Sequence, residues 1–317
     1  MRILVTGGTG FIGQRVVEKL TARNQDIVIL SRQPQPSSTG AEAKASIVAG
    51  DIRIFADMVK AVSDNKIDRV IHVAYTLTAE GEANPLLALQ VNVLGASHVF
   101  ETARICAVDR VVFCSSIAAY APQSLYGERL LSEEENLMKP ASIYGATKVL
   151  NEFMASRFET RYGLEIPVLR ISAVYGTGRA GRGVTAWTTQ MVAGAVRSQP
   201  VFIKLRAKQL SNFIYVDDVA EQLVRLTLAE KLAHRVYNSG GYPAATEDFA
   251  FIVKKYYPHF QVDFDPNANL WPYPHLVDGT RLEKEIDLKI KTPEEGLLEQ
   301  INQERRLLGQ EPLTKRN

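Results

Sequence analysis

The chain has 317 residues, of which 46% are hydrophobic, so it can bury the core of one elaborated domain or of two interleaved lobes. Its 37 basic and 35 acidic residues leave a formal charge of +2, which gives no reason to expect a nucleic-acid partner or binding to an anionic membrane. No apolar run is long enough to span a bilayer and no signal-like segment precedes the first strand, so we expect a cytoplasmic protein that binds a small molecule.

The N-terminal segment predicts a strand, a glycine-rich turn, a helix and a second strand. Ile3–Val5 is typical of a buried parallel strand, Arg15–Leu20 has helical spacing, and Val28–Leu30 supplies the next strand. The glycines of the turn allow the backbone to approach a phosphate closely, and the helix that follows directs its free amides at the anion. The residues expected to bind a dinucleotide here are Gly7, Gly10, Phe11, Ile12 and Gly13.

Strands and helices continue to alternate through the first half of the chain. The further strands are expected at Ile27–Leu30, Ser46–Val48, Val70–Val73, Val111–Cys114 and Pro167–Ile171. The clearest long helices are Leu86–Ala107 and Ser142–Tyr162. Because the connections are long enough for crossover helices, we expect an α/β fold with a doubly wound parallel sheet. The apolar faces of the two long helices either pack internally or form a dimer interface.

The cysteine and histidine residues predict neither a disulfide framework nor a metal centre. Cys106 and Cys114 have apolar neighbours, which indicates reduced thiols in the core. The five histidines are scattered, with no pair at the spacing of metal ligands. We therefore expect no metal site.

A phenol and an ammonium group lie four residues apart in the second long helix. Tyr144 and Lys148 share one helix face, where the ammonium favours the phenolate and lowers the tyrosine pKa. Such a tyrosine can exchange a proton with a substrate hydroxyl or carbonyl, although an exposed helix pair without a catalytic role has the same spacing. Ser115 and Ser116 follow a predicted strand at the edge where open α/β sheets bind ligands, so a serine hydroxyl there can bind the reacting oxygen.

Together these features resemble the extended short-chain dehydrogenase/reductase superfamily, particularly its NAD(P)-dependent epimerase/dehydratase branch. Motifs similar to those of the family occur in order at Thr6–Gly13, Gly50–Ile52, His72–Ala74, Asn92–Gly95, Ser115–Tyr120, Tyr144–Lys148, Leu169–Gly176 and Phe213–Ala220. The resemblance implies that Ser116 orients the substrate, that Tyr144 is the acid or base, and that Lys148 modulates its pKa and binds the nicotinamide ribose. Ser115 is the less favoured partner.

The resemblance also implies further cofactor contacts and a division into two lobes. Asp51 and Ile52 would flank the adenine, and Ala74 and Asn92 would lie along the cofactor, with a structural role as the alternative for Asn92. A Rossmann domain is expected over 1–172 plus about 212–241, and a smaller C-terminal α/β substrate lobe over about 173–211 and 242–317. Substrate would lie between the lobes, and two copies would associate as a homodimer through the two long helices.

The residues after the second strand favour NADP(H) as the cofactor. NAD-preferring enzymes commonly carry an acidic residue at the position of Ser31, which is followed by Arg32. A hydroxyl and a guanidinium can bind a 2′-phosphate that a carboxylate would repel. NAD remains the alternative, because backbone contacts dominate the pyrophosphate site.

Departures from the family pattern bear on the reaction. Ile117 and Ala118 stand where the dehydratases have an acidic pair, so dehydration is disfavoured. Ala173 and Ser211 replace the asparagine and arginine of many nucleotide-sugar epimerases. Residues that could bind an anion, but that more often form a solvated basic face, are Arg179, Arg182, Arg206 and Lys208.

We therefore expect an NAD(P)-dependent oxidoreductase that transfers a hydride between the nicotinamide and a secondary alcohol or carbonyl carbon. Its substrate would be small and sugar-like, a polyol or a keto compound. One alternative is a nucleotide-sugar 4-epimerase with a retained cofactor. A second alternative, of a different class, is a non-catalytic dinucleotide-sensing protein.

Overall fold

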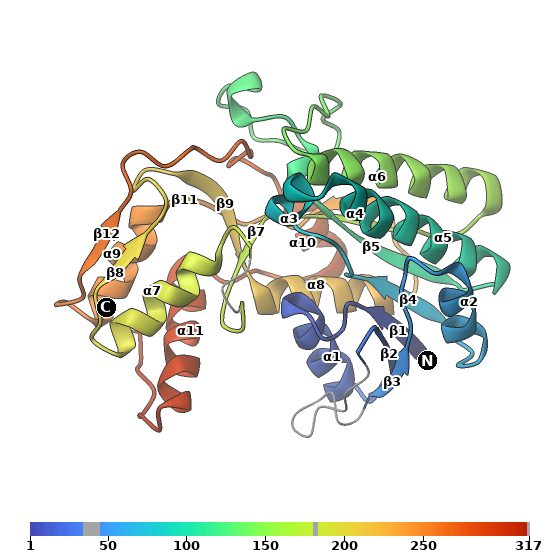
Figure 1. The fold of residues 1–317 in the computed structure, drawn as a ribbon, viewed down its shortest axis with the longest axis horizontal. Helices are drawn as coiled ribbons and strands as arrows, with labels where there is room; N and C mark the ends of the chain where they lie inside the picture. Colours follow the sequence, from blue (N-terminus) through green and yellow to red (C-terminus); the bar gives the residue numbers. More distant parts are fainter. Residues whose placement is uncertain (34–44, 180–182, 316–317) are drawn as a thin grey trace.

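A seven-stranded parallel sheet forms the centre of the protein (Figure 1). The computed structural model describes residues 1–33, 45–179 and 183–315. Within these ranges the strand order is β10-β6-β5-β4-β1-β2-β3, and every neighbouring pair is parallel. The strands are β1 (Arg2–Thr6), β2 (Asp26–Ser31), β3 (Ser46–Ala49), β4 (Arg69–His72), β5 (Arg110–Ser116), β6 (Val168–Ile171) and β10 (Val236–Asn238). The doubly wound parallel sheet expected from the sequence is confirmed.

Helices cover both faces of this sheet. Helices α1 (Phe11–Ala22) and α8 (Val216–Leu228) pack together on one face. Helices α2 (Phe55–Ser63), α5 (Gly95–Ile105) and α6 (Ile143–Tyr162) cover the other face (Figure 1). The strands are apolar runs because both of their faces are buried: in β1, Ile3 and Val5 join the core beneath α1 and α8, whereas Leu4 joins the core on the opposite face.

The segment expected as one helix over Leu86–Ala107 has three parts. It begins as α4 (Pro85–Ala88), where the side chain of Asn84 accepts a hydrogen bond from the Leu87 amide at 3.1 Å. It continues as a π-helical stretch, Leu89–Leu94, and then as α5. Within the π-helical stretch the Asn92 carbonyl accepts a hydrogen bond from Asn151 Nδ2 on α6 at 2.6 Å. The widened helix is therefore tied to its neighbour by side-chain bonds that its spacing in the sequence does not reveal.

Helix α6 has clear boundaries and lies close to the end of β5. Ser142 caps its first turn by accepting a hydrogen bond from the Gly145 amide at 3.1 Å, and Gly163 ends it with a φ of 71°. A side chain at Gly145 would overlap the backbone of Ala118, in the 3₁₀ turn Ile117–Ala119 that follows β5. The absence of a side chain at Gly145 therefore lets α6 approach this turn.

The C-terminal lobe joins the α1 and α8 face of the sheet through a continuous apolar core. Its two small sheets have the orders β11-β9-β7 and β12-β8. Its strands and helices are β7 (Ala173–Tyr175), α7 (Ala186–Val196), β8 (Val201–Ile203), β9 (Leu210–Tyr215), β11 (Tyr242–Ala245), α9 (Thr246–Tyr256), β12 (Val262–Phe264), α10 (Thr280–Ile286) and α11 (Pro293–Leu307). Strand β9 pairs with β7 and β11, whereas β10 returns to the central sheet beside β6. A short helix, α3 (Thr78–Ala83), follows β4.

Membrane-spanning helices and clusters of metal ligands are both absent from the described residues. In the part of the chain that the structure describes, no helix is sufficiently long and apolar to cross a membrane. Over the same residues, no three or more histidine, cysteine or acidic side chains gather in an arrangement that suits a metal ion. Cys106 and Cys114 are free thiols, and Cys114 is buried.

Candidate active site

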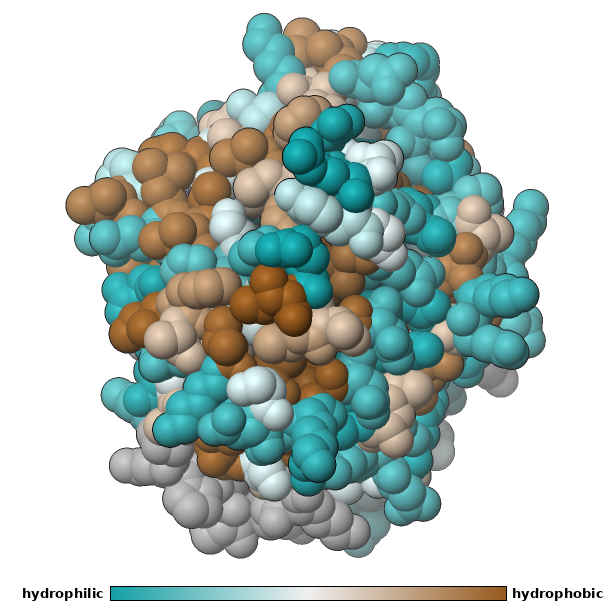
Figure 2. Space-filling model, turned by 90° about the vertical axis from the view of Figure 1, so that its right-hand side faces the viewer, coloured by the Kyte–Doolittle hydropathy of each residue, from teal (hydrophilic) through white to brown (hydrophobic). Residues whose placement is uncertain are grey.

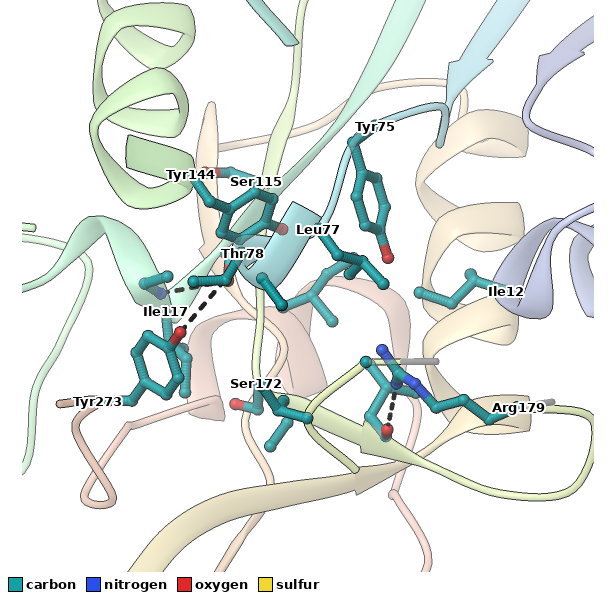
Figure 3. A pocket seen from close by; sticks show the side chains of 18 of the residues that line it. Ile12, Tyr75, Leu77, Thr78, Ser115, Ile117, Tyr144, Ser172, Arg179 and Tyr273 are labelled. Carbon is teal, nitrogen blue, oxygen red and sulfur yellow. Dashed lines mark hydrogen bonds between the residues drawn. The ribbon is translucent and has the colours of Figure 1, made fainter. Parts of the chain in front are cut away.

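Two adjoining cavities lie at the carboxyl edge of the central sheet. One, of about 510 Å³, follows the glycine-rich turn between β1 and α1. The other, of about 430 Å³, lies against the end of β5, the start of α6 and the loop after β7 (Figure 3). Open α/β sheets bind ligands at this edge. The residues that border both cavities are Ile12, Tyr75, Leu77, Glu80 and Arg179.

The glycine-rich turn fits the pyrophosphate of a dinucleotide. Gly7 has a φ of +74°, and the Gly10 amide donates to the Gly7 carbonyl at 3.0 Å, which closes the turn. A side chain at Gly13 would overlap the backbone of Gly7, so this glycine allows α1 to start against the turn. Because no side chain caps α1 at Gly10, its first amides remain available for an anion. All five residues expected in this turn line the first cavity, as does Ala74.

The residues expected near the adenosine lie beyond these two cavities. Arg32 is exposed, and the Ser31 hydroxyl donates to the Gln33 carbonyl at 3.1 Å. Asp51 accepts hydrogen bonds from the guanidinium of Arg53 at 2.6 and 2.9 Å, and these bonds, as the largest cause, lower the pKa of Asp51. Ile52 is buried against Gly95 at the start of α5.

Ser116 and Tyr144 meet in the second cavity. The Tyr144 and Ser116 side chains line the same cavity, and Ser116 Oγ accepts a hydrogen bond from the Ala118 amide at 3.1 Å. Ser115, by contrast, donates to Glu152 on α6. The structure therefore brings the Ser116 hydroxyl to the phenol and commits the Ser115 hydroxyl to a carboxylate.

Lys148 is buried behind aromatic rings. Its Nζ donates to the Cys114 carbonyl at 2.7 Å and lies 4.8, 5.0 and 5.3 Å from the ring centres of Tyr75, Phe113 and Tyr144. Burial lowers the pKa of Lys148 to about 8, while these rings stabilise the ammonium through cation–π contacts. Lys148 lines neither of the two cavities, whereas Tyr75, whose ring it contacts, borders both.

The expected lowering of the Tyr144 pKa by Lys148 is wrong for this arrangement. Burial is the largest effect and raises the pKa of Tyr144 well above its usual value. The ammonium of Lys148 donates its hydrogen bond to the backbone carbonyl of Cys114. Tyr144 is therefore a neutral phenol here, which is the form that donates a proton.

A buried ion pair holds α6 beside the sheet. Arg170 on β6 donates to the carboxylate of Glu152 at 2.8 and 3.1 Å, and both side chains are at most 9% exposed. Arg170 also donates to the Tyr120 hydroxyl at 2.8 Å. The carboxylate, more than any other partner, raises the pKa of Arg170 against the opposing effect of burial. The pair fixes the helix that carries Tyr144.

Asn92 has a structural role in the described geometry. Its side chain accepts from the Thr76 amide at 2.7 Å and donates to the Thr76 carbonyl at 3.1 Å. It is buried and does not line either cavity. These bonds make Asn92 an anchor for the loop that carries Tyr75, and a contact of Asn92 with the cofactor stays a prediction.

Sequence reasoning missed Tyr75 and misplaced Arg179. The ring centres of Tyr75 and Tyr144 are 5.8 Å apart, and the Tyr75 hydroxyl points toward the side of Ile12 and Arg179 (Figure 3). Arg179 is 9% exposed, donates to the Val174 carbonyl at 2.7 Å and lies 4.9 Å from the Phe11 ring centre, and its burial lowers its pKa. Its assignment to a solvated face is therefore wrong.

The other basic candidates differ from Arg179. Arg206 and Lys208 are exposed, as a solvated face requires, and Arg182 lies outside the described residues. The signals available in the sequence were positional: Tyr75 directly follows Ala74, and Arg179 follows the glycines after β7.

Comparisons with known proteins assign the family. Residues 3–240 match the NAD dependent epimerase/dehydratase family. The chain is 32% identical to a Methanocaldococcus jannaschii protein provisionally named a UDP-glucose 4-epimerase, over 69% of this chain and 71% of that protein. It is 29% identical to the mitochondrial L-threonine 3-dehydrogenase of Bos taurus, over 86% of this chain and 74% of the relative. The structure of a Thermotoga maritima UDP-glucose 4-epimerase with UDP-glucose matches with a TM-score of 0.85 and 25% identity, covering 97% of this chain and 100% of that one.

The chain belongs to the NAD-dependent epimerase/dehydratase family. It is an enzyme, an oxidoreductase of this family, and the resemblance inferred from its motifs is confirmed. The interpretation as a non-catalytic sensor is set aside, because the relatives are named as epimerases and dehydrogenases.

The position of Tyr75 predicts that it shields Lys148. Replacing Tyr75 by alanine is expected to speed labelling of Lys148 by an amine-reactive reagent by roughly an order of magnitude, because solvent then reaches a buried amine. Tyr75→Phe keeps the ring and is expected to label as slowly as the parent. The measurement is peptide mass spectrometry of cofactor-free protein at alkaline pH, where the amine is neutral in every variant. Equal labelling of Lys148 in all three proteins would show that Tyr75 is not its cover.

Proposed function

We propose that the protein catalyses net hydride transfer between a nicotinamide dinucleotide and a small carbonyl compound or secondary alcohol. The observation that supports this most directly is that Ser116 and Tyr144 line one cavity, which adjoins the cavity at the glycine-rich turn. Residues 1–172 and about 212–241 would bind the cofactor, and the remaining lobe would cover the substrate.

In this proposal the nicotinamide supplies the hydride donor or acceptor. The Ser116 hydroxyl orients the reacting oxygen, and the Tyr144 phenol gives that oxygen a proton in reduction or takes one in oxidation. A pKa raised by burial keeps Tyr144 protonated and favours the donating role. Lys148 holds a positive charge behind the phenol and binds the nicotinamide ribose once Tyr75 moves aside.

The proposed cofactor contacts come from the β1–α1 turn and from the edge of the sheet. The amides of the turn and of α1 would hold the pyrophosphate, and Arg179 would add a guanidinium beside Phe11. Asp51 and Ile52 would flank the adenine. Ser31 and Arg32 would bind a 2′-phosphate, so we propose NADP(H) as the preferred form, with NAD as the alternative.

A nucleotide-sugar 4-epimerase that retains its cofactor is the second candidate. The relatives named as UDP-glucose 4-epimerases support this candidate. The relative named as an L-threonine 3-dehydrogenase supports net hydride transfer equally well. The two are separated by how fast the bound dinucleotide exchanges with free dinucleotide, followed by nicotinamide fluorescence. Rapid exchange supports net hydride transfer, and a nucleotide that barely dissociates supports the epimerase.

The phenol of Tyr144 is expected to be needed for turnover. Tyr144→Phe should lower kcat by about 10²- to 10⁴-fold, because the reacting oxygen loses its proton donor, while the dissociation constant of the dinucleotide stays the same. Tyr273→Phe is the matched control, since this phenol lines the same cavity and is bonded to Thr78. Equal activity of Tyr144→Phe and the parent would remove Tyr144 from the mechanism.

Arg32 is expected to discriminate between the two dinucleotides. Arg32→Ala should weaken binding of NADPH by roughly tenfold or more and leave that of NADH unchanged, because only NADPH carries the 2′-phosphate. Arg129→Ala, an exposed arginine paired with Glu135, serves as the control. Titrations followed by nicotinamide fluorescence measure both affinities. Equal weakening of both, or of neither, contradicts the 2′-phosphate assignment.

We also propose a cytoplasmic homodimer that associates through α5, α6 and the helical segment before α5. Hydrophobic side chains gather in the upper left of the face where α5 and α6 lie (Figure 2). Exposed apolar residues on these segments are Leu86, Leu89, Leu94, Ile105, Leu150, Phe153 and Tyr162. We propose a second copy of this chain as the partner, because the sequence predicts apolar faces on the two long helices.

Phe153 provides the test of this interface. It is 64% exposed, so Phe153→Lys is expected to leave the fold intact and to shift sedimentation from dimer toward monomer. Phe251→Lys, on α9 of the other lobe and 67% exposed, is the matched control and should sediment like the parent. A parent protein that sediments as a monomer would refute the proposal outright.

A further inference from the structure

Positions at which the sequence departs from the family pattern converge in the cavity beside Tyr144. Ile117 and Ala118 enter it from the 3₁₀ turn after Ser116, and Ala173 enters it from the start of β7. The two segments are far apart in the chain, yet each supplies a small or branched apolar side chain to one cavity (Figure 3). The replacements at Ile117, Ala118 and Ala173 are therefore one spatial feature, whereas Ser211 lies outside this cavity.

Neighbouring side chains extend this apolar lining. Leu77 follows β4, Val174 follows Ala173 on β7, and Val184 lies before α7, and all three border the same cavity. Together with Ile117 and Ala173 they form what we call the apolar wall. The wall faces the space next to the Ser116 and Tyr144 hydroxyls, where the substituents of a reacting carbon have to lie.

Polar groups around this space are engaged in bonds within the protein. The hydroxyls of Thr78 and Tyr273 are hydrogen-bonded to each other at 3.2 Å, and Ser172 donates to the Gly240 carbonyl at 2.7 Å. Arg179 lies on the cofactor side against Phe11, and the exposed Glu80 borders the cofactor cavity as well. A hydroxylated arm placed on the apolar wall would lose its water partners without gaining protein partners.

We infer that the substrate is a ketone, or the matching secondary alcohol, whose reacting carbon carries an alkyl or aryl group that packs on the apolar wall. This inference rests on the proposed hydride transfer and narrows its substrate to the keto class, in place of sugar-like compounds and polyols. In reduction, the carbonyl carbon accepts a hydride from the reduced dinucleotide and the oxygen accepts the proton of Tyr144. Solvent then returns a proton to the phenolate, so the ketone and one proton become the alcohol as the dinucleotide is oxidised.

The test compares chain length with hydroxylation. With purified enzyme and each reduced dinucleotide, methyl ketones from acetone to 2-heptanone are compared with 1,3-dihydroxyacetone and L-erythrulose, which match acetone and 2-butanone in chain length. Each added methylene is expected to raise kcat/KM about threefold to fourfold, as burial of apolar surface does. Hydroxylated ketones of equal length are expected to be at least roughly tenfold worse. UDP-glucose is included to detect epimerisation.

Two variants test whether the apolar wall causes the preference for longer alkyl chains. Val184→Thr and Ala173→Asn are expected to reduce the increase of kcat/KM with the chain length of the ketone, because each places a polar group against the alkyl chain. Val262→Thr on β12 makes the same change as Val184→Thr outside the cavity and is expected to keep the increase. Unchanged dinucleotide binding shows that each variant is folded.

Binding measured without turnover separates this inference from the proposed function. Calorimetric titration of 2-heptanone into the protein is expected to show a negative heat-capacity change, and L-erythrulose is expected to bind more weakly. If no ketone is reduced but this order of binding holds, the hydride-transfer proposal fails and the apolar specificity stands. If hydroxylated ketones are reduced or bound as well as the alkyl ketones, the inference is overturned and hydride transfer stands.

Discussion

The register of α6 against β5 is the constraint on which the site depends. Residues one helical turn apart on α6 meet the end of this strand: Lys148 donates to the Cys114 carbonyl, and Glu152 accepts from Ser115. Tyr144, one turn earlier, lines the same cavity as Ser116. Arg170 on the next strand holds the carboxylate of Glu152 in a buried pair. Loss of one partner of a buried pair destabilises a protein by about 3–5 kcal/mol, so the helix is held firmly in place. The phenol and the serine stay aligned as a consequence.

Burial at this point of the fold shapes the chemistry of the site in two opposite directions. It lowers the pKa of Lys148 to about 8 and raises the pKa of Tyr144, because it disfavours the charged form of each group. The cavity therefore presents a neutral phenol as its proton donor, with a weakly basic amine behind it. The apolar wall extends this buried, weakly polar environment along the cavity. Polar contacts to a substrate are strong in such surroundings.

Much of the fold could be predicted from local patterns. The buried runs of β1, β2 and β5 and the glycine-rich turn depend on neighbouring residues, and the structure has them where the sequence places them. The helix expected over Leu86–Ala107 was only partly right, because Asn84 starts it earlier and the bonds of Asn92 to Thr76 and of Asn151 to Asn92 belong to a π-helical stretch. Those bonds join segments that are distant in the sequence, whereas hydrophobic periodicity describes only residues close together in the chain.

By itself the sequence determined the α/β class, the dinucleotide turn and the residues Ser116, Tyr144 and Lys148 as candidates, because glycine spacing and helix periodicity are local properties. Only the tertiary structure decided that the Tyr75 ring packs against Lys148, that Arg179 is buried where the two cavities adjoin, and that burial raises the pKa of Tyr144. Burial and charge at these positions arise from side chains of distant segments. Solvent exclusion is set by packing, and packing is complete only in the folded chain.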